Sequence, residues 1–323
     1  MARSPLSPQS LLKNPTVLPG ALVVALLLLV AWRNPNFFTS SGLAGAILVA
    51  APLILASIAI TPIAIVGRGG VDLSIGPLVG FVNVLIVTKL ARLGLDSPLA
   101  VFVFAIAAAC LWQALLAALI IYTRVPPILV SLAGYLILQG VNLLILPRPG
   151  GTAPDWLSDW GFGTNVFSPV LFVLLLAALG WWCLQRSSVF QQIRLTGADE
   201  RMAYTCGVDI KAARWTAHIV AGVYAGLAAV CLTGLIGSGD PTQGNTLSLQ
   251  AVTAVVLGGT SLAGGRGGAL GSALGAVAMY LIFVVLSSFN FGALSGFMTQ
   301  MSFGLILVLS LTTSALRARP QYA

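Results

Sequence analysis

The chain has 323 residues, of which 58% are hydrophobic and only 7% are charged. A soluble domain carries roughly 25% charged residues, so most of this surface must face lipid and not water. The formal charge of +8 would favour nucleic acid in a soluble protein. Here the basic residues lie in loops between apolar runs, where orientation in a membrane explains them, so we exclude nucleic-acid binding.

Ten apolar runs are long enough to cross a bilayer, because a helix needs roughly 20 apolar residues to span the hydrocarbon core. The predicted spans are 16–32, 43–66, 72–91, 98–122, 126–147, 167–185, 214–237, 247–264, 267–288 and 293–316. The first run has no small-residue cleavage site after it, so we interpret it as an uncleaved helix. We therefore expect an all-α polytopic membrane protein, with residues 1–323 forming one transmembrane domain.

The distribution of basic residues predicts the orientation. With the N-terminus in the cytoplasm, twelve of the sixteen basic residues lie inside: Arg3, Lys13, Arg68, Arg124, Arg186, Arg194, Arg201, Lys211, Arg214, Arg266, Arg317 and Arg319. The positive-inside rule selects this arrangement. It makes the tails 1–15 and 317–323 cytoplasmic, together with a polar segment at 186–214 that interrupts the apolar series.

Glycine-rich breaks occur at corresponding places in the two halves. Residues 69–76 open the third span, and residues 264–271 open or precede the ninth. Five spans per half make the second and seventh spans run in opposite directions. This pattern predicts an inverted repeat of two five-helix halves, a common plan in transporters.

The chain lacks the residues that catalysis and nucleotide binding require. It has one histidine, no carboxylate pair in an apolar run and no G-x-x-x-x-G-K-[ST] loop. The four cysteines have no metal-site or disulfide spacing. We therefore expect no catalytic residue, no metal and no cofactor on this chain, and any ATP must bind to another subunit.

Two ionisable residues could serve ion coupling. Asp72 lies at the mouth of the third span, where capping a helix is favoured over a transport role. His218 lies within the seventh span, where a hydrogen bond to a neighbouring helix is favoured over a proton relay.

The remaining polar residues inside spans are neutral. Amides and hydroxyls would suit the path of an uncharged polar solute, because they form hydrogen bonds without burying charge. The alternative is that they join helices, at about 1 kcal/mol each. The predicted pathway residues are Gln113, Ser131, Gln139, Asn142, Gln250 and Thr253.

The polar segment contains a predicted short helix. Gly197 breaks the chain before it, Asp199 can cap it, and Gly207 can end it. Met202, Ala203 and Cys206 follow at three- and four-residue spacing. They form either an exposed docking ridge or the face of a helix that lies on the membrane.

Two motifs carry a resemblance to a known family. Residues 255–265 read VVLGGTSLAGG and residues 69–76 read GGVDLSIG. Both resemble signatures of ABC importer permeases of the ribose, xylose and autoinducer type, and the resemblance covers about residues 40–316. The motif positions are Gly69, Gly70, Asp72, Ser74, Gly258, Gly259, Thr260, Ser261, Gly264 and Gly265.

The resemblance implies an importer of monosaccharides or similar small polar solutes in a bacterial cytoplasmic membrane. Two permeases, identical or homologous, would pair, and ATPase subunits carrying ATP and Mg would dock on their polar segments. An extracytoplasmic binding protein would deliver the solute. The implied coupling residues are Gly197, Asp199, Glu200, Arg201, Met202, Ala203, Cys206 and Gly207.

Some positions depart from the family pattern. Residues 248–253 read SLQAVT, where many relatives have E-L-D-A-I-A, and Gln139 stands where arginine is frequent. These changes leave the sugar open and suit pairing with a non-identical permease. The alternatives are a branched-chain amino-acid permease, an ATPase-independent secondary transporter or channel, and a non-transporting scaffold.

Overall fold

The computed structural model describes residues 16–318, except 68, 163–164 and 290–293. This part of the chain is helical throughout, and its one isolated β-bridge joins Gly150 to Gly239. The helices are α2 (Val17–Arg33), α3 (Ser40–Val66), α4 (Ile75–Leu85), α5 (Pro98–Thr123), α6 (Pro127–Ile145), α7 (Asp155–Ser158), α8 (Pro169–Arg186), α9 (Ser188–Ala198), α10 (Glu200–Thr205), α11 (Ile210–Ile236), α12 (Gln243–Leu257), α13 (Ala269–Ser287) and α14 (Ser295–Ala318).

Six of the described helices, α3, α5, α6, α8, α11 and α13, are long and apolar enough to cross a membrane. Three of the other predicted spans correspond to shorter apolar helices: α2, α4 with its π-helical continuation Ile86–Leu90, and α14 over its apolar part. The remaining predicted span overlaps α12, which is neither long nor apolar enough to count among these helices. Large leucines point outward from the bundle, and Leu144 is 82% exposed. Such a surface fits contact with lipid. The all-helical membrane class is therefore confirmed, whereas the inverted repeat stays a prediction.

The predicted span 247–264 is wrong in its second half. α12 begins earlier, at Gln243, and ends at Leu257. Gly258 lies in close backbone contact with α13. A Cβ atom at position 258 would overlap the carbonyl oxygen of Gly271. Gly259 adopts a φ of +80°, which favours glycine and ends the helix. Residues 258–268 are consequently a loop that leads into α13.

Two long antiparallel helices form the centre of the bundle. α3 and α11 have 27 residues each, and most of their residues are buried. α5 packs closely on α11, because Gly222 and Gly226 leave room for its backbone: a Cβ atom at Gly226 would lie 2.7 Å from the Cα atom of Ile106. Small residues allow this approach, which is how helices associate in lipid.

A second close seam joins α4 to α12. A Cβ atom at Gly76 would overlap the carbonyl oxygen of Gly244, and the reverse also holds. The Ser248 hydroxyl donates to the carbonyl of Leu73 at 2.6 Å and accepts from the amide of Gly76 at 3.1 Å. The N-terminal part of α4 is therefore fixed to α12.

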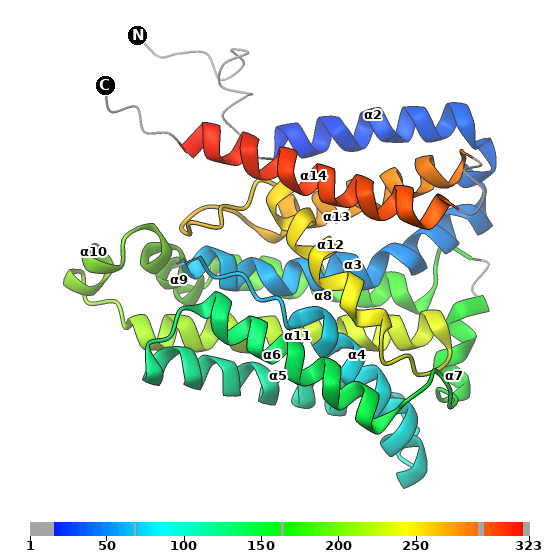
Figure 1. The fold of residues 1–323 in the computed structure, drawn as a ribbon, viewed down its shortest axis with the longest axis horizontal. Coiled ribbons are helices and arrows are strands. Elements are labelled where there is room, and N and C mark those ends of the chain that lie inside the picture. The colour runs from blue at the N-terminus through cyan, green and yellow to red at the C-terminus, as the bar shows by residue number, and fades with distance from the viewer. Residues whose placement is uncertain (1–15, 68, 163–164, 290–293, 319–323) are drawn as a thin grey trace.

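The two ends of the bundle differ. α9 and α10 project from one end, and α7 lies at the other (Figure 1). The amide of Ala153, just before α7, donates to the carbonyl of Gly237 at the end of α11. The predicted tail 1–15 and residues 319–323 of the predicted tail 317–323 lie outside the described residues, whereas α14 continues through Ala318. The orientation of both termini stays a prediction.

Candidate functional site

The polar segment folds as two helices and not as one. α9 is capped by Ser187, whose hydroxyl accepts from the amide of Phe190 at 3.3 Å. Gly197 was predicted to break the chain before a single helix, but it lies inside the last turn of α9. The break falls at Asp199, whose backbone is extended. The helix α9 was not predicted from the sequence.

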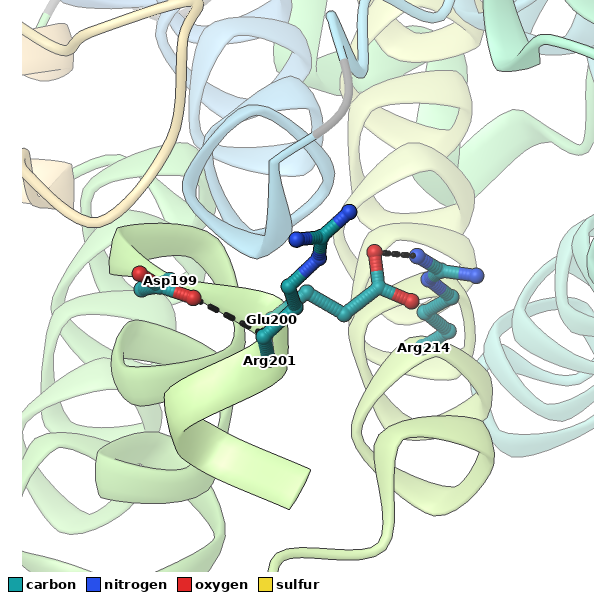
Figure 2. A network of polar contacts seen from close by, with 4 residues as sticks. All are labelled: Asp199, Glu200, Arg201 and Arg214. Carbon is teal, nitrogen blue, oxygen red and sulfur yellow. Dashed lines mark hydrogen bonds and ion pairs between the residues drawn. The ribbon is translucent and has the colours of Figure 1, made fainter. Parts of the chain in front are cut away.

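The predicted ends of α10 are confirmed. Asp199 Oδ1 accepts from the amide of Arg201 at 2.9 Å (Figure 2) and from that of Met202 at 3.0 Å. At the other end Gly207 has a φ of +81°. Its amide donates to Tyr204, while the amide of Val208 donates to Ala203. This pair of bonds is the Schellman motif, which satisfies the last carbonyls of a helix.

The exposed face of α10 differs from the predicted ridge by one residue. Met202 is 65% exposed and Cys206 is exposed, but Ala203 is buried. Ala203 faces inward because α10 packs on α9 and α11. Tyr204, which sequence reasoning missed, is 73% exposed. We call Met202 and Cys206, which stand four residues apart on one side of α10, the docking face; Tyr204, two residues after Met202, lies on another side of the helix.

An ion pair joins α10 to the central helix α11. Arg214 Nη2 lies 2.9 Å from Glu200 Oε2, with the two side chains 13% and 31% exposed (Figure 2). Partly exposed pairs of this kind contribute roughly 1 kcal/mol or less. The pair therefore serves to orient α10 against α11 more than to stabilise the fold.

Four glycines from three segments meet beneath the polar segment. Gly67 ends α3, Gly197 lies in α9, and Gly264 and Gly265 lie in the loop after α12. A Cβ atom at Gly197 would overlap the carbonyl oxygen of Ile65, and one at Gly264 would lie 2.7 Å from the Cα atom of Gly67. The amide of Gly265 donates to that same Ile65 carbonyl at 2.8 Å.

We call these four residues the glycine junction. It brings Gly197 of the polar segment together with Gly264 and Gly265 of the second motif, which the sequence did not predict. Gly67 was missed, although it stands two residues before the Gly69-Gly70 pair.

The other motif residues shape the loops around this junction. Gly70 lies under the end of α3, where a Cβ atom would overlap the carbonyl oxygen of Ile63. Thr260 Oγ1 lies 3.2 Å from Ser272 Oγ of α13, which accepts from Thr61 of α3 at 2.7 Å. Remaining motif positions are Gly69, with a φ of +66°, and Ser261, whose hydroxyl accepts from Ala263.

Asp72 takes part in a buried polar chain. Its Oδ1 accepts from the amide of Ser74 at 2.8 Å and from the Ser74 hydroxyl at 2.7 Å. Its Oδ2 accepts from Gln113 Nε2 at 2.6 Å, and Gln113 Oε1 lies 2.7 Å from His218 Nδ1. Since the amide oxygen can only accept, His218 Nδ1 carries the proton.

This chain of contacts joins the segment before α4 to α5 and α11. Asp72 caps the turn at Ser74 and not the first residue of α4, which begins at Ile75. The predicted bond of His218 to a neighbouring helix is confirmed. Gln113, predicted to line the pathway, has both ends of its amide engaged by protein groups.

Three further predicted pathway residues are also bonded inside the bundle. Ser131 on α6 donates to Val71 at 2.9 Å, and Thr253 donates to Leu249 in its own helix. Asn142 donates to Pro77 at 3.1 Å, while its Oδ1 is buried without a partner among the described residues. All three side chains are buried.

The last two predicted pathway residues, Gln139 on α6 and Gln250 on α12, are only partly buried. Gln250 lines a cavity between the helices, whereas Gln139 does not. The six predicted residues are thus not brought together at one site. Within the described ranges, no group of three His, Cys, Asp or Glu side chains is placed to hold a metal ion.

Residues 42–311 match the family described as branched-chain amino acid transport system / permease component. The chain is 28% identical over 222 residues to the autoinducer 2 import system permease protein LsrD of Salmonella typhimurium, which covers 66% of each protein. It is 28% identical to the D-allose transport system permease protein AlsC of Escherichia coli, over 61% of each. The chain spans 66% and 61% of the length of these two relatives, less than two thirds of each.

A longer match is to the probable ABC transporter permease protein YphD of Escherichia coli, 29% identical over 91% of this chain and 88% of that protein. No solved structure matches.

Gln113→Leu should destabilise the protein. The substitution leaves Asp72 and His218 buried without their partner, which costs about 3 kcal/mol. We expect a lower thermal unfolding midpoint in detergent. Gln139→Leu, the same change at a partly buried site on α6, should leave the midpoint unchanged. Unchanged stability in Gln113→Leu would contradict the structural role of this amide.

Gly197→Ala should disrupt the glycine junction. The added methyl group overlaps the Ile65 carbonyl, and relieving such overpacking costs about 1–3 kcal/mol. A lower unfolding midpoint is expected. Gly45→Ala in α3 is the control, because a Cβ atom there meets nothing within 4 Å. Equal midpoints for the two variants would rule out a close contact at Gly197.

Proposed function

Because the chain belongs to the family of branched-chain amino acid transport system permease components, we propose that it is the transmembrane subunit of an ATP-driven importer. Its cargo would be a monosaccharide or a similar small polar solute. The observation that carries this proposal, beyond the family, is the polar segment. An apolar docking face on a short, doubly capped helix outside the bundle fits a surface that receives a separate subunit.

The polar segment would receive the ATPase. Met202 and Tyr204 expose large side chains beside the charged Glu200 and Arg201, a composition typical of subunit interfaces. ATP and Mg would bind to the partner, since this chain has no phosphate-binding loop. Gly197, Asp199 and Gly207 would hold the helix in position, with Cys206 on the contact surface.

Movement of the ATPase would be transmitted to the helix bundle through two sets of contacts. The Glu200–Arg214 pair connects α10 to α11, and the glycine junction connects α9 to the end of α3 and to the loop before α13. Both α3 and α11 lie at the centre of the bundle. Displacement of α9 and α10 as a unit would therefore tilt the central helices, which is the motion that alternating access requires.

The proposed class of solute is supported by the neutral polar side chains within the spans and by the names of the relatives. LsrD and AlsC are named for autoinducer 2 and D-allose, both small polar molecules. The family description favours a branched-chain amino acid as the second candidate. A zwitterion would require charged partners, and Asp72, the buried carboxylate described above, is already engaged by Ser74 and Gln113. We therefore favour a neutral solute.

The importer would need further partners. A second permease, identical or homologous, would complete the pathway, and an extracytoplasmic binding protein would deliver the solute. A relative from Escherichia coli is named an inner membrane ABC transporter permease, so the same bacterial membrane is proposed here. Both termini and the polar segment would lie in the cytoplasm.

Met202→Asp should break the docking face while leaving the fold intact, because this side chain is 65% exposed. A carboxylate buried against an apolar partner costs more than about 1.4 kcal/mol, so recovery of the ATPase should fall at least about tenfold. ATP-dependent uptake should fall with it.

The matched control is Leu95→Asp. Leu95 is 48% exposed on the loop before α5, on the side predicted to face outward. It should retain both the ATPase and uptake. Normal uptake in Met202→Asp would exclude docking at this face.

Co-purification from the native locus in mild detergent should recover an ATPase with a phosphate-binding loop, identified by mass. The number of permease species in the complex distinguishes a homodimer from a heterodimer. Recovery of this chain alone, with solute flux that survives ATP depletion, would instead identify a secondary transporter.

A further inference from the structure

A cavity of about 240 Å³ opens between α3, α11, α12, α13 and α14. Its polar lining comes from Gln243, Thr246, Gln250 and Tyr280, and its apolar lining includes Phe283 and Phe303. The volume equals that of roughly eight liquid water molecules, at about 30 Å³ each. The cavity can therefore hold one small molecule.

The cavity lies in the half of the bundle that carries α7. Leu232 and Leu235, in the last turns of α11, form part of its wall. α11 ends at Ile236 and is followed by its cap residue Gly237, whose carbonyl accepts from Ala153 immediately before α7. The cavity is thus far along α11 from the polar segment, toward the face predicted to meet the binding protein.

α12 presents different side chains to its two neighbours. Gly244 and Ser248 face α4 and form the close seam. Gln243 and Gln250, seven residues or about two turns apart, line the cavity. The close contact with α4 fixes the position of α12. The side-chain amides of Gln243 and Gln250 are therefore held in place on a packed helix.

These amides differ from the other polar groups of the bundle. Gln113, Ser131 and Asn142 donate to protein groups. Among the described residues, the side chains of Gln243, Gln250 and Tyr280 form no hydrogen bond. Gln243 is exposed, and Gln250 and Tyr280 are partly buried, so a molecule in the cavity would find their polar groups available.

We infer that this cavity is a solute-binding site within the single chain, for one neutral polyhydroxyl molecule. Each glutamine offers both donors and acceptors, as does the tyrosine hydroxyl, which matches hydroxyl groups. The aromatic rings supply apolar surface for carbon-bound hydrogens. No charged side chain lines the cavity in the described part of the chain, which disfavours ions and zwitterions. The inference rests on the proposed importer function.

The test compares ATP-driven uptake into vesicles reconstituted with the permease, its ATPase and its binding protein. The probes are radiolabelled D-allose, D-ribose and D-xylose, supplied at saturating concentration. Gln250→Leu should lower the maximal uptake of the transported sugar about fivefold, the factor expected for one lost neutral hydrogen bond. Tyr280→Phe should lower it as well.

Gln300→Leu is the matched control, because Gln300 is exposed on α14 and does not line the cavity. ATP hydrolysis and complex yield should be the same in all variants, so that uptake per ATP separates a solute contact from a folding defect. Uptake in Gln250→Leu equal to that in Gln300→Leu would overturn the site while leaving the importer function intact.

Two other results would also overturn it. Absence of uptake for all three sugars, with uptake of a radiolabelled branched-chain amino acid by the same unmodified complex, removes both the neutral-sugar cargo and this site while leaving the importer function intact. Loss of a co-purified phospholipid from Gln250→Leu, with normal sugar uptake, would assign the cavity to lipid.

Discussion

Helices inside a bilayer gain little from the hydrophobic effect when they meet, because lipid tails are as apolar as leucine. The bundle depends instead on backbones that approach closely at glycine. Gly76 meets Gly244 between α4 and α12, and Gly258 meets Gly271 between α12 and α13. At each of these places a Cβ atom would overlap a carbonyl oxygen. Few residues other than glycine can therefore occupy these contact positions.

The glycine junction extends the same constraint to the polar segment. Side chains that join two helices can change rotamer and absorb a displacement, whereas contacting backbones cannot. Gly197 lies directly on the end of α3, and Gly265 donates to the same carbonyl that Gly197 covers. A force on α9 must accordingly move α3 and the loop before α13 together, which suits a segment that receives an ATPase.

Local chemistry allowed part of this structure to be predicted. The apolar runs indicated the helices, and Asp199 and Gly207 marked the ends of α10, because caps act within a few residues. Tertiary contacts explain the errors. Ala203 is buried only because α10 packs on its neighbours, and Gly258 makes a close backbone contact only because α13 lies against it. Neither contact can be predicted from the residues of α10 or of α12 alone.

The neutral polar residues show why a pathway is hard to read from composition. Every amide or hydroxyl within a span has the same chemistry in sequence, yet its role depends on whether the protein already supplies a partner. Gln113 is fully buried and bridges Asp72 and His218, so both ends of its amide are engaged by the protein. Gln250 faces a cavity with its amide unbonded among the described residues. Satisfaction of hydrogen bonds, a three-dimensional property, therefore separates groups that join helices from groups that can bind cargo.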